Sequence, residues 1–295
     1  MKRIIGLLLA SIIVLAACSG GGNSKKVTVG VASNDTAAWE KVKELAKKDD
    51  IDLEIKHFSD YNVPNKALSD GDIDMNAFQH FAFLNEYKKA HKDAKIEAIS
   101  TTVLAPLGIY SKKVKDIKDV KDGAQVMIPN DVSNQARALK LLESAGLIKL
   151  KDNFGLSGTT KDIKDNPKHL KIKEVDAQQT ARALDDVDIS VINNGVATKA
   201  GLDAKKDPIY LESSTSDAVK PYINLIAVNS KDKDNKTYKK IVDLYHSKEA
   251  QEALKKDTKD GEKAVDLSQK EIKDIEDSLK SVSYTHLTLP TTPYV

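Results

Sequence analysis

The sequence predicts an α/β protein of two lobes with a ligand cleft between them, and three observations support this. The chain opens with an apolar run at 27–31 (VTVGV), a helical pattern at 36–48 and an alternating run at 51–55 (IDLEI). This strand-helix-strand order is typical of a parallel α/β sheet. A second set of such elements occupies residues 125–192, and a further apolar strand at 222–228 follows it.

The chain should therefore cross between the lobes twice. We expect the crossings near 107–111 and 220–227. The predicted layout is a first lobe at 27–110, a second lobe at 111–222 and a return to the first lobe at 223–280. The cleft between two such lobes is a usual site for a small molecule.

In the first lobe, Pro64 begins a helix that Gly71 ends. A brief strand at 73–75 then carries the segment NAFQHFAFL (76–84) at its carboxyl end, where open α/β sheets bind ligands. In the second lobe we expect a helix at 133–144 between strands. The predicted strands are 125–128 (QVMI), 172–175 (IKEV) and 189–192 (ISVI), and 237–256 is expected to form one helix.

Residues 1–17 form a predicted secretory signal, with a basic start, an apolar run and small residues before Cys18. The run is too short to span a bilayer, which takes about 20 apolar residues. Leu15-Ala16-Ala17-Cys18 resembles a lipobox, which directs cleavage before the cysteine and attachment of diacylglycerol to its thiol. Cys18 is the only cysteine, so no disulfide is possible within the chain. Residues 18–26 would form a flexible tether.

The other end changes character abruptly. The segment SQKEIKDIEDSLK, which ends at Lys280, has the pattern of a charged amphipathic helix. Residues 281–295 (SVSYTHLTLPTTPYV) contain no Lys, Arg, Asp or Glu, which is typical of a non-native tail, so we exclude them from the fold. The alternative is a genuine terminal strand.

The composition indicates a solvated surface. The net charge is only +2 although 31% of the residues are charged, and both signs alternate along the chain. A nucleic-acid partner would require a basic patch, so none is expected.

Arg137 lies in the early turns of the helix at 133–144. A cation there opposes the helix dipole at a cost of about 0.3–1 kcal/mol. A bound anion would remove that conflict, and the guanidinium matches a carboxylate in shape. Arginine occurs only at positions 3, 137 and 182 of this lysine-rich chain, which favours a functional role over a solvated surface position.

Three asparagines occupy unfavourable places. Asn193 and Asn194 directly follow the strand ISVI, and Asn224 lies inside the strand PYINLIAV. Asparagine is disfavoured in strands, and a buried amide needs partners. Either these amides pair with protein groups, or their carbonyl oxygens accept protons from a ligand ammonium.

Aromatic residues are concentrated around His80. Three of the five phenylalanines, Phe78, Phe81 and Phe83, lie within six residues of one another, and we expect Phe81 to belong to the core. An aromatic slot suits an apolar or thioether side chain, because sulfur–aromatic contacts contribute about 0.3–1.5 kcal/mol. A carboxylate on Arg137, an ammonium on the asparagines and a side chain on the aromatics together describe a free amino acid or very small peptide.

These segments resemble the methionine-binding lipoproteins of ABC importers, the MetQ/NlpA family, from the lipobox to about Leu267. The resemblance rests on four ordered segments: FSDYNVPNKALSDGDIDMNAFQHFAFL (58–84), IPNDVSNQARALKLLESAGLIKLKD (128–152), SVINNGVATKAGL (190–202) and YINLIAV (222–228).

The resemblance implies a periplasmic-binding-protein-like fold that closes on L-methionine, or on a short methionine peptide, and delivers it to an ABC permease with its ATPase. It assigns the ligand carboxylate to Arg137 and the ammonium to Asn193 and Asn224. The side chain would lie near Tyr61, Phe78, His80 and Phe83. We expect a monomer without cofactor or metal, anchored through the lipid on Cys18 to the extracytoplasmic face of the cell membrane.

The chain departs from the family pattern at two places. Many relatives have Pro-Tyr at Ala82-Phe83, so a phenolic hydroxyl is missing here. Many relatives also have Thr-Thr-Tyr at Asn194-Gly195-Val196, and the lost bulk would enlarge the cleft. Because some relatives resemble glycyl-methionine binders, that dipeptide is an alternative ligand.

Other classes of protein are less well supported. An enzyme would need a catalytic motif, and no HExxH, CxxC, nucleophile elbow or phosphate-binding loop occurs. A metal-uptake lipoprotein would need several converging His, Asp or Glu ligands, whereas His80 has aromatic neighbours. A surface adhesin would not need Arg137 or the asparagines.

Overall fold

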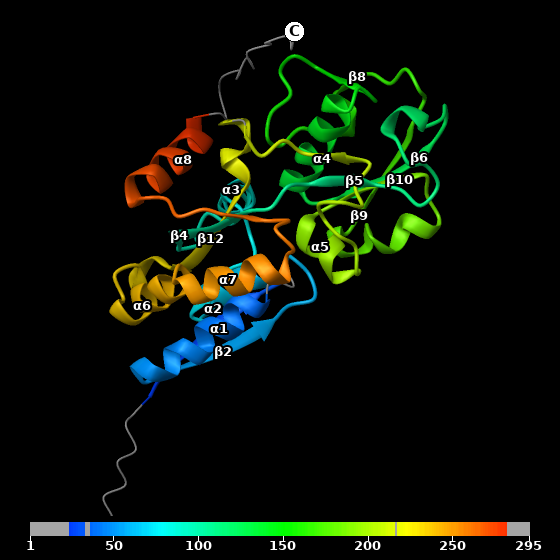
Figure 1. Cartoon of the computed structure of the whole chain (residues 1–295). Helices are drawn as coiled ribbons and strands as arrows, with labels where there is room; N and C mark the ends of the chain where they lie inside the picture. Colours follow the sequence, from blue (N-terminus) through cyan, green and yellow to red (C-terminus); the bar gives the residue numbers. More distant parts are fainter. Residues whose placement is uncertain (1–23, 33–35, 216, 282–295) are drawn as a thin grey trace, which may run out of the picture.

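The computed structural model describes residues 24–32, 36–215 and 217–281. The predictions for the signal peptide, for Cys18, for most of the tether and for the tail beyond residue 281 lie outside these residues. The described chain forms two β-sheets with flanking helices and a small two-stranded ladder (Figure 1).

The first sheet has six strands in the order β13-β4-β12-β3-β1-β2. β1 is parallel to β2 and β3, whereas β12 is antiparallel to β3 and β4. The strands are β1 (Lys25–Val31), β2 (Ile51–His57), β3 (Met75–Asn76), β4 (Ile96–Leu104), β12 (Ile223–Asn229) and β13 (Lys263–Ala264). The helices packed on this sheet are α1 (Thr36–Ala46), α2 (Pro64–Asp70), α3 (Phe81–Ala90), α6 (Lys236–Tyr245), α7 (Lys248–Asp257) and α8 (Gln269–Ser281).

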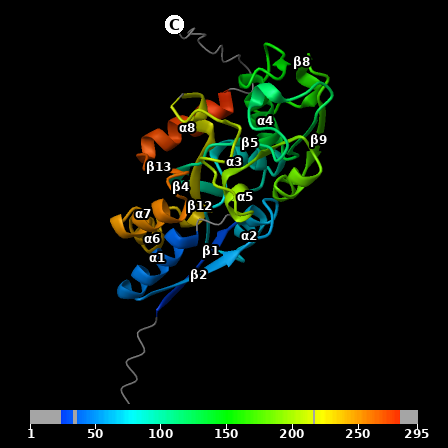
Figure 2. The same ribbon diagram turned by 45° about the vertical axis from the view of Figure 1, so that its right-hand side comes forward.

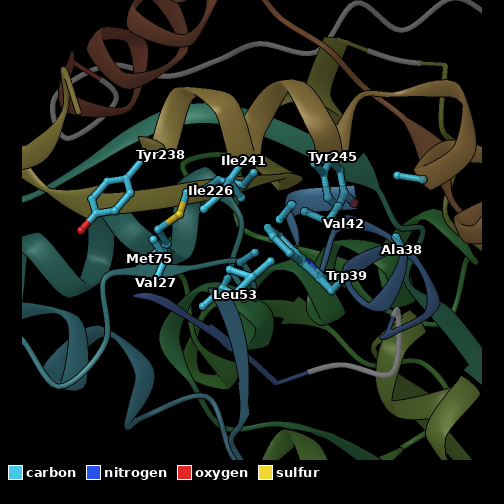
Figure 3. Close-up of a cluster of buried hydrophobic side chains, with 14 of the residues drawn as sticks. Val27, Ala38, Trp39, Val42, Leu53, Met75, Ile226, Tyr238, Ile241 and Tyr245 are labelled. Atoms are coloured by element: carbon cyan, nitrogen blue, oxygen red, sulfur yellow. The ribbon is translucent and has the colours of Figure 1, made fainter. Parts of the chain in front are cut away.

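Helices from both ends of the chain share one core on this sheet. Trp39 of α1 is fully buried, and its ring centroid lies 5.0 Å from that of Tyr245 in α6 (Figure 3). Leu53 and Ile226 of the sheet pack in the same cluster. The opposite face carries a second core with α2, α3 and α8, to which Phe81 belongs as predicted. The first sheet is therefore covered by helices on both faces.

The second sheet has five strands in the order β11-β5-β10-β6-β9. β6 is parallel to β9 and β10, and β5 is antiparallel to β10. The elements of this region are β5 (Gly108–Tyr110), β6 (Gln125–Pro129), α4 (Val132–Ser144), β7 (Lys149–Leu150), β8 (Ile163–Asp165), β9 (Lys171–Val175), β10 (Ile189–Ile192), α5 (Asn194–Lys199) and β11 (Tyr210–Leu211). Short 3₁₀ helices lie at Lys47–Asp49, Ile117–Asp119, Thr160–Asp162, Ala177–Gln179, Arg182–Asp185, Asp217–Tyr222 and Ser230–Asp232.

The chain passes between the sheets twice, in agreement with the predicted two-lobed α/β fold. It leaves the first sheet after Leu104 and enters the second at Gly108, and it returns between Leu211 and Ile223. We call residues 105–107 the first crossover and residues 212–222 the second. In Figure 2, β1 and the late helices α6 and α7 lie together, away from β8 and β9.

The outer limits of the lobes, at residues 110 and 222, stay predictions. β5 falls inside the predicted first-lobe range of 27–110, yet it pairs with β10 and β11 of the second sheet. The first passage thus lies slightly earlier in the chain than the expected 107–111 region.

One helix prediction was wrong, and several elements were not predicted, of which β4 and α3 are the longest. The expected helix at 237–256 is two helices, because Ser247 caps a new helix by accepting a hydrogen bond from the Ala250 amide at 3.3 Å. β4 and α3 had not been expected. β4 buries Thr101, whose hydroxyl donates to the Val265 carbonyl at 2.8 Å, so its buried residues include polar ones and its apolar pattern is weak.

Candidate functional site

One cavity lies between the two lobes and receives side chains from both. Its space is about 620 Å³, including the part open to solvent. All seven predicted site residues line it: Tyr61, Phe78, His80, Phe83, Arg137, Asn193 and Asn224. Asn194 and Gly195, which the sequence analysis also considered near the ligand, belong to the lining as well. The remaining lining residues were not predicted: Ala77, Gln79, Thr102, Val103, Ala105, Asn134 and Glu262.

Four rings from the first lobe, Tyr61, Phe78, His80 and Phe83, form what we call the aromatic wall. The centroids of Phe78 and Phe83 are 5.6 Å apart and edge-to-face, and Tyr61 lies 6.1 Å from Phe78 and 6.3 Å from Phe83. His80 meets Phe83 at 6.3 Å in the same manner. Edge-to-face packing is favourable between aromatic rings, so these rings support one another.

His80 has a defined tautomer. It is the N-cap of α3, and its Nδ1 accepts a hydrogen bond from the Phe83 amide at 3.1 Å. The ring proton therefore belongs on Nε2, which lies 3.3 Å from Oδ1 of Asn134 and can donate to it. Burial, together with the charge of Arg137, lowers the pKa of His80 to about 3. His80 is thus neutral at physiological pH.

A buried amide cluster lies behind the aromatic wall. Asn65 and Gln79 exchange two hydrogen bonds, of 2.7 and 2.6 Å, and Asn76 joins both of them at 3.0 Å. All three residues are at most 2% exposed. Because Gln79 stands between Phe78 and His80 in the sequence, this cluster fixes the backbone that carries both rings.

The polar wall, on the second lobe, consists of Asn134, Arg137, Asn193 and Asn194. Nδ2 of Asn193 donates to Oδ1 of Asn134 at 2.7 Å, and Nδ2 of Asn134 donates to the Asp131 carboxylate at 3.0 Å. Oδ1 of Asn193 is buried and has no hydrogen-bond partner among the described residues. An unpaired buried acceptor is costly, so this carbonyl is suited to a donor from a ligand.

Asn194 repeats this arrangement at the next position. Its Nδ2 donates to the Gly261 carbonyl at 3.1 Å, which joins the second lobe to the first, and its buried Oδ1 has no partner in the described part of the chain. Asn224, on β12, donates from Nδ2 to the Val103 carbonyl at 3.4 Å. Glu262 adds a carboxylate to the cavity lining, so the acceptors favour a cationic group.

Arg137 already has an anionic partner within the protein. Its Nε donates to Glu212 Oε1 at 2.9 Å, and its Nη2 donates to Glu212 Oε2 and to the Ala105 carbonyl, the latter at 3.0 Å. Its Cζ lies 4.4 Å from the centroid of the Tyr222 ring. Burial disfavours the charged form, but the Glu212 carboxylate outweighs burial and raises the Arg137 pKa.

This contact corrects part of the sequence argument. The anion that offsets the dipole conflict of Arg137 is Glu212, so a ligand need not supply it. The Nε–Nη2 edge is engaged, which leaves Nη1 for a ligand. The role of Arg137 as a carboxylate ligand remains a prediction.

Among the residues that the structure describes, no group of three or more His, Cys, Asp or Glu side chains could hold a metal ion. Within the same residues, no helix is long and apolar enough to cross a membrane.

Some unpredicted lining residues had a detectable signal and others did not. Asn134 lies one turn before Arg137, so the two share a helix face, and this spacing alone could have identified it. Glu262 lies in a connection between α7 and β13, where no local pattern marks it.

Two α/β lobes joined by two crossovers, with a cavity between them lined from both sides, define a two-lobed substrate-binding protein. The family model described as NlpA lipoprotein matches residues 27–266, and the chain belongs to this family. The resemblance noted in the sequence is thereby confirmed.

Individual relatives agree with this assignment. The chain is 42% identical over 257 residues to the D-methionine-binding lipoprotein MetQ of Salmonella typhimurium, covering 85% of this chain and 93% of the relative. A crystal structure of protein PG110 from Staphylococcus aureus is 80% identical, with a TM-score of 0.85, covering 86% of this chain and 99% of the other. A nutrient-binding protein from Burkholderia cenocepacia, solved bound to methionine, is 45% identical, with a TM-score of 0.76, covering 81% and 99% of the two chains.

Proposed function

We propose that this chain is the substrate-binding lipoprotein of an ABC importer and captures free methionine. The observation that carries the proposal is that an aromatic wall, a buried arginine and an unpaired amide carbonyl line one cavity. Relatives whose names or structures include methionine lend support. The role is binding without chemical conversion of the ligand.

Each part of methionine has a proposed partner. Arg137 binds the carboxylate through Nη1, and Asn193 Oδ1 accepts a proton from the ammonium, with Asn224 nearby on the cavity lining. Tyr61, Phe78, His80 and Phe83 contact the thioether, whose sulfur suits aromatic neighbours. These contacts involve both lobes, so ligand binding favours the closed arrangement.

Two direct contacts support closure as part of the mechanism. The His80 ring meets Asn134 across the cavity at 3.3 Å, and Asn194 donates to Gly261 at 3.1 Å. Each contact joins the two lobes, so the open arrangement would lose both. The closed protein would deliver the ligand to a permease and its ATPase. The lipid on Cys18 would hold the protein, as a monomer, on the extracytoplasmic face of the membrane.

Glycyl-methionine is the second candidate. Gly195 lines the cavity without a side chain, and Asn194 Oδ1 and the Glu262 carboxylate provide further acceptors. A dipeptide could place its ammonium among these acceptors while its methionine occupies the aromatic wall.

The test is calorimetry of the protein, unfolded to release any co-purified ligand and then refolded. It would be titrated with L-methionine, D-methionine and glycyl-L-methionine, and mass spectrometry would identify the released molecule. Saturable binding of methionine supports the first candidate, and binding of the dipeptide alone supports the second. Binding of none of these ligands would refute the proposal.

A further inference from the structure

Arg137 is held by groups from both crossovers. From the first crossover, the Ala105 carbonyl accepts from Nη2 at 3.0 Å. From the second, Glu212 accepts from Nε and Nη2, and the Tyr222 ring lies against the guanidinium. Arg137 itself belongs to α4 of the second lobe. One side chain thus contacts both of the segments that would absorb a hinge motion between the lobes.

Glu212 is the centre of this arrangement. Besides Arg137, its carboxylate accepts a hydrogen bond from the Leu107 amide of the first crossover at 3.1 Å. The Glu212 side chain is only 13% exposed and that of Arg137 only 3%. A buried carboxylate with these partners links the second crossover both to the first crossover and to the arginine. No sequence pattern identified Glu212, and it does not line the cavity.

We propose that Glu212 is a positioning residue, which fixes Arg137 to both crossovers and presents its Nη1 group to the carboxylate of the ligand. This inference rests on the proposed function, because Arg137 must meet a ligand carboxylate. Among the described residues no hydrogen bond engages Nη1, while Nε and Nη2 are both engaged. The occupied edge prevents rotation of the guanidinium and leaves one end of it for the ligand.

The same contacts connect ligand binding to the hinge. Hinge motions are absorbed by a few residues in the segments between lobes. Glu212 bridges the two crossovers here and also holds Arg137. When Arg137 binds the ligand carboxylate, it therefore favours the arrangement of the crossovers in which these contacts are made. A purely structural ion pair would stabilise the fold but would not distinguish ligands with a carboxylate from ligands without one.

The experiment compares methionine with methioninamide, which lacks the carboxylate, by calorimetry on wild type and Glu212→Gln. We expect the variant to lose at least about tenfold in methionine affinity, but less than about twofold in methioninamide affinity. Glu212→Asp, which keeps the charge on a shorter side chain, should be intermediate for methionine. The control is Asp217→Asn, the same chemical change at an exposed position of the same crossover, which should alter neither affinity.

An equal loss for both ligands would overturn the proposal, since it would indicate a general structural effect. An unchanged or tighter affinity for methionine in Glu212→Gln would overturn it as well. If Glu212→Gln fails to fold, Glu212→Asp decides the question by the same comparison.

A second measurement needs no ligand. The chain has only three arginines, so their Nε–H signals are easily separated by nitrogen-15 NMR, and Arg182→Lys removes one of them for assignment. The Arg137 Nε proton should exchange slowly with water in wild type and in Asp217→Asn, but rapidly in Glu212→Gln. Slow exchange in Glu212→Gln would overturn the positioning role. Failure of wild type to bind either ligand would instead refute the proposed function, and the two failures are therefore distinguishable.

Discussion

The aromatic wall comes largely from one short stretch of the chain, whereas the polar wall depends on groups that are far apart in sequence. Phe78, His80 and Phe83 lie within six residues, and the rings of Phe78 and His80 each pack against the ring of Phe83. In contrast, Arg137 and Glu212 are separated by 75 residues. The aromatic wall is an apolar surface that its own packing stabilises. The polar wall is a set of charged and amide groups that come together only in the complete fold.

This difference predicts different responses to substitution. In the aromatic wall several rings contact the side chain of the ligand. Loss of one ring should therefore reduce the ligand affinity modestly and change the preference for one ligand side chain over another. In the polar wall the groups are joined by specific hydrogen bonds, so removal of one group leaves another buried group without compensation. The four predictions below test this contrast, from the largest expected effect to the smallest.

Arg137→Ala should have the largest effect. Methionine binding should weaken by about 2–5 kcal/mol, a factor of roughly 30 or more, since a buried charged partner is lost. Stability should also fall by about 3–5 kcal/mol, because Glu212 is left without its cation. Calorimetry and urea unfolding measure the two effects. Arg182→Ala, at an exposed arginine, is the control, and an unchanged affinity in Arg137→Ala would exclude the carboxylate role.

Asn193→Ala should weaken methionine binding by about 1–3 kcal/mol, because the ammonium loses an acceptor and Asn134 loses a donor. The affinity for 4-(methylthio)butanoate, which has no ammonium, should change much less. Titration calorimetry with both ligands measures the difference. Asn130→Ala, at an exposed asparagine of the same lobe, provides the control. Equal losses for both ligands would contradict an ammonium contact.

Phe78→Leu should reduce methionine affinity by about 0.5–1.5 kcal/mol, since ring contacts are lost while an apolar surface remains. The preference for methionine over norleucine, which replaces sulfur by a methylene group, should also shrink. Competition binding measures both quantities. Phe154→Leu, at a partly buried residue packed against the core of the second sheet and outside the cavity lining, should leave the preference intact. A loss as large as that of Arg137→Ala would remove the proposed contrast between the walls.

The low pKa of His80 should make the stability of the protein depend on pH below neutrality, without affecting it at neutral pH. Its folded pKa of about 3 lies below the ordinary value of about 6.5. Between these values the unfolded chain binds a proton that the folded chain does not, so the free energy of unfolding decreases as the pH falls below about 6.5. Urea unfolding at several pH values should show this decrease.

His80→Asn should make the decrease smaller, because asparagine does not titrate and is also a favourable N-cap for α3. His169→Asn, at a histidine whose side chain is 79% exposed, should leave the decrease as in wild type. The assignment to His80 fails if its variant and wild type have the same pH dependence.

The sequence predicted the parts of the molecule that have a local pattern. The opening strand-helix-strand unit, the helix that carries Arg137 and the cluster around His80 all follow from periodicity or composition. β4 escaped prediction because Ser100, Thr101 and Thr102 are buried there and weaken its apolar pattern. Likewise, Glu262 and Glu212 belong to connecting segments. The surroundings of their carboxylates are set by residues far away in the sequence, so no local pattern identifies them.

One feature of the first sheet bears on export. β12 lies between β3 and β4, yet it follows the whole second sheet in the chain. A chain emerging from its amino end has all five strands of the second sheet by Leu211, whereas the first sheet lacks an inner strand until residues 223–229 appear. Because domains fold as units once their segments are available, the second sheet can assemble early. The first sheet waits for β12, so in a chain that folds as it emerges we expect the arginine-bearing lobe to form before the aromatic one.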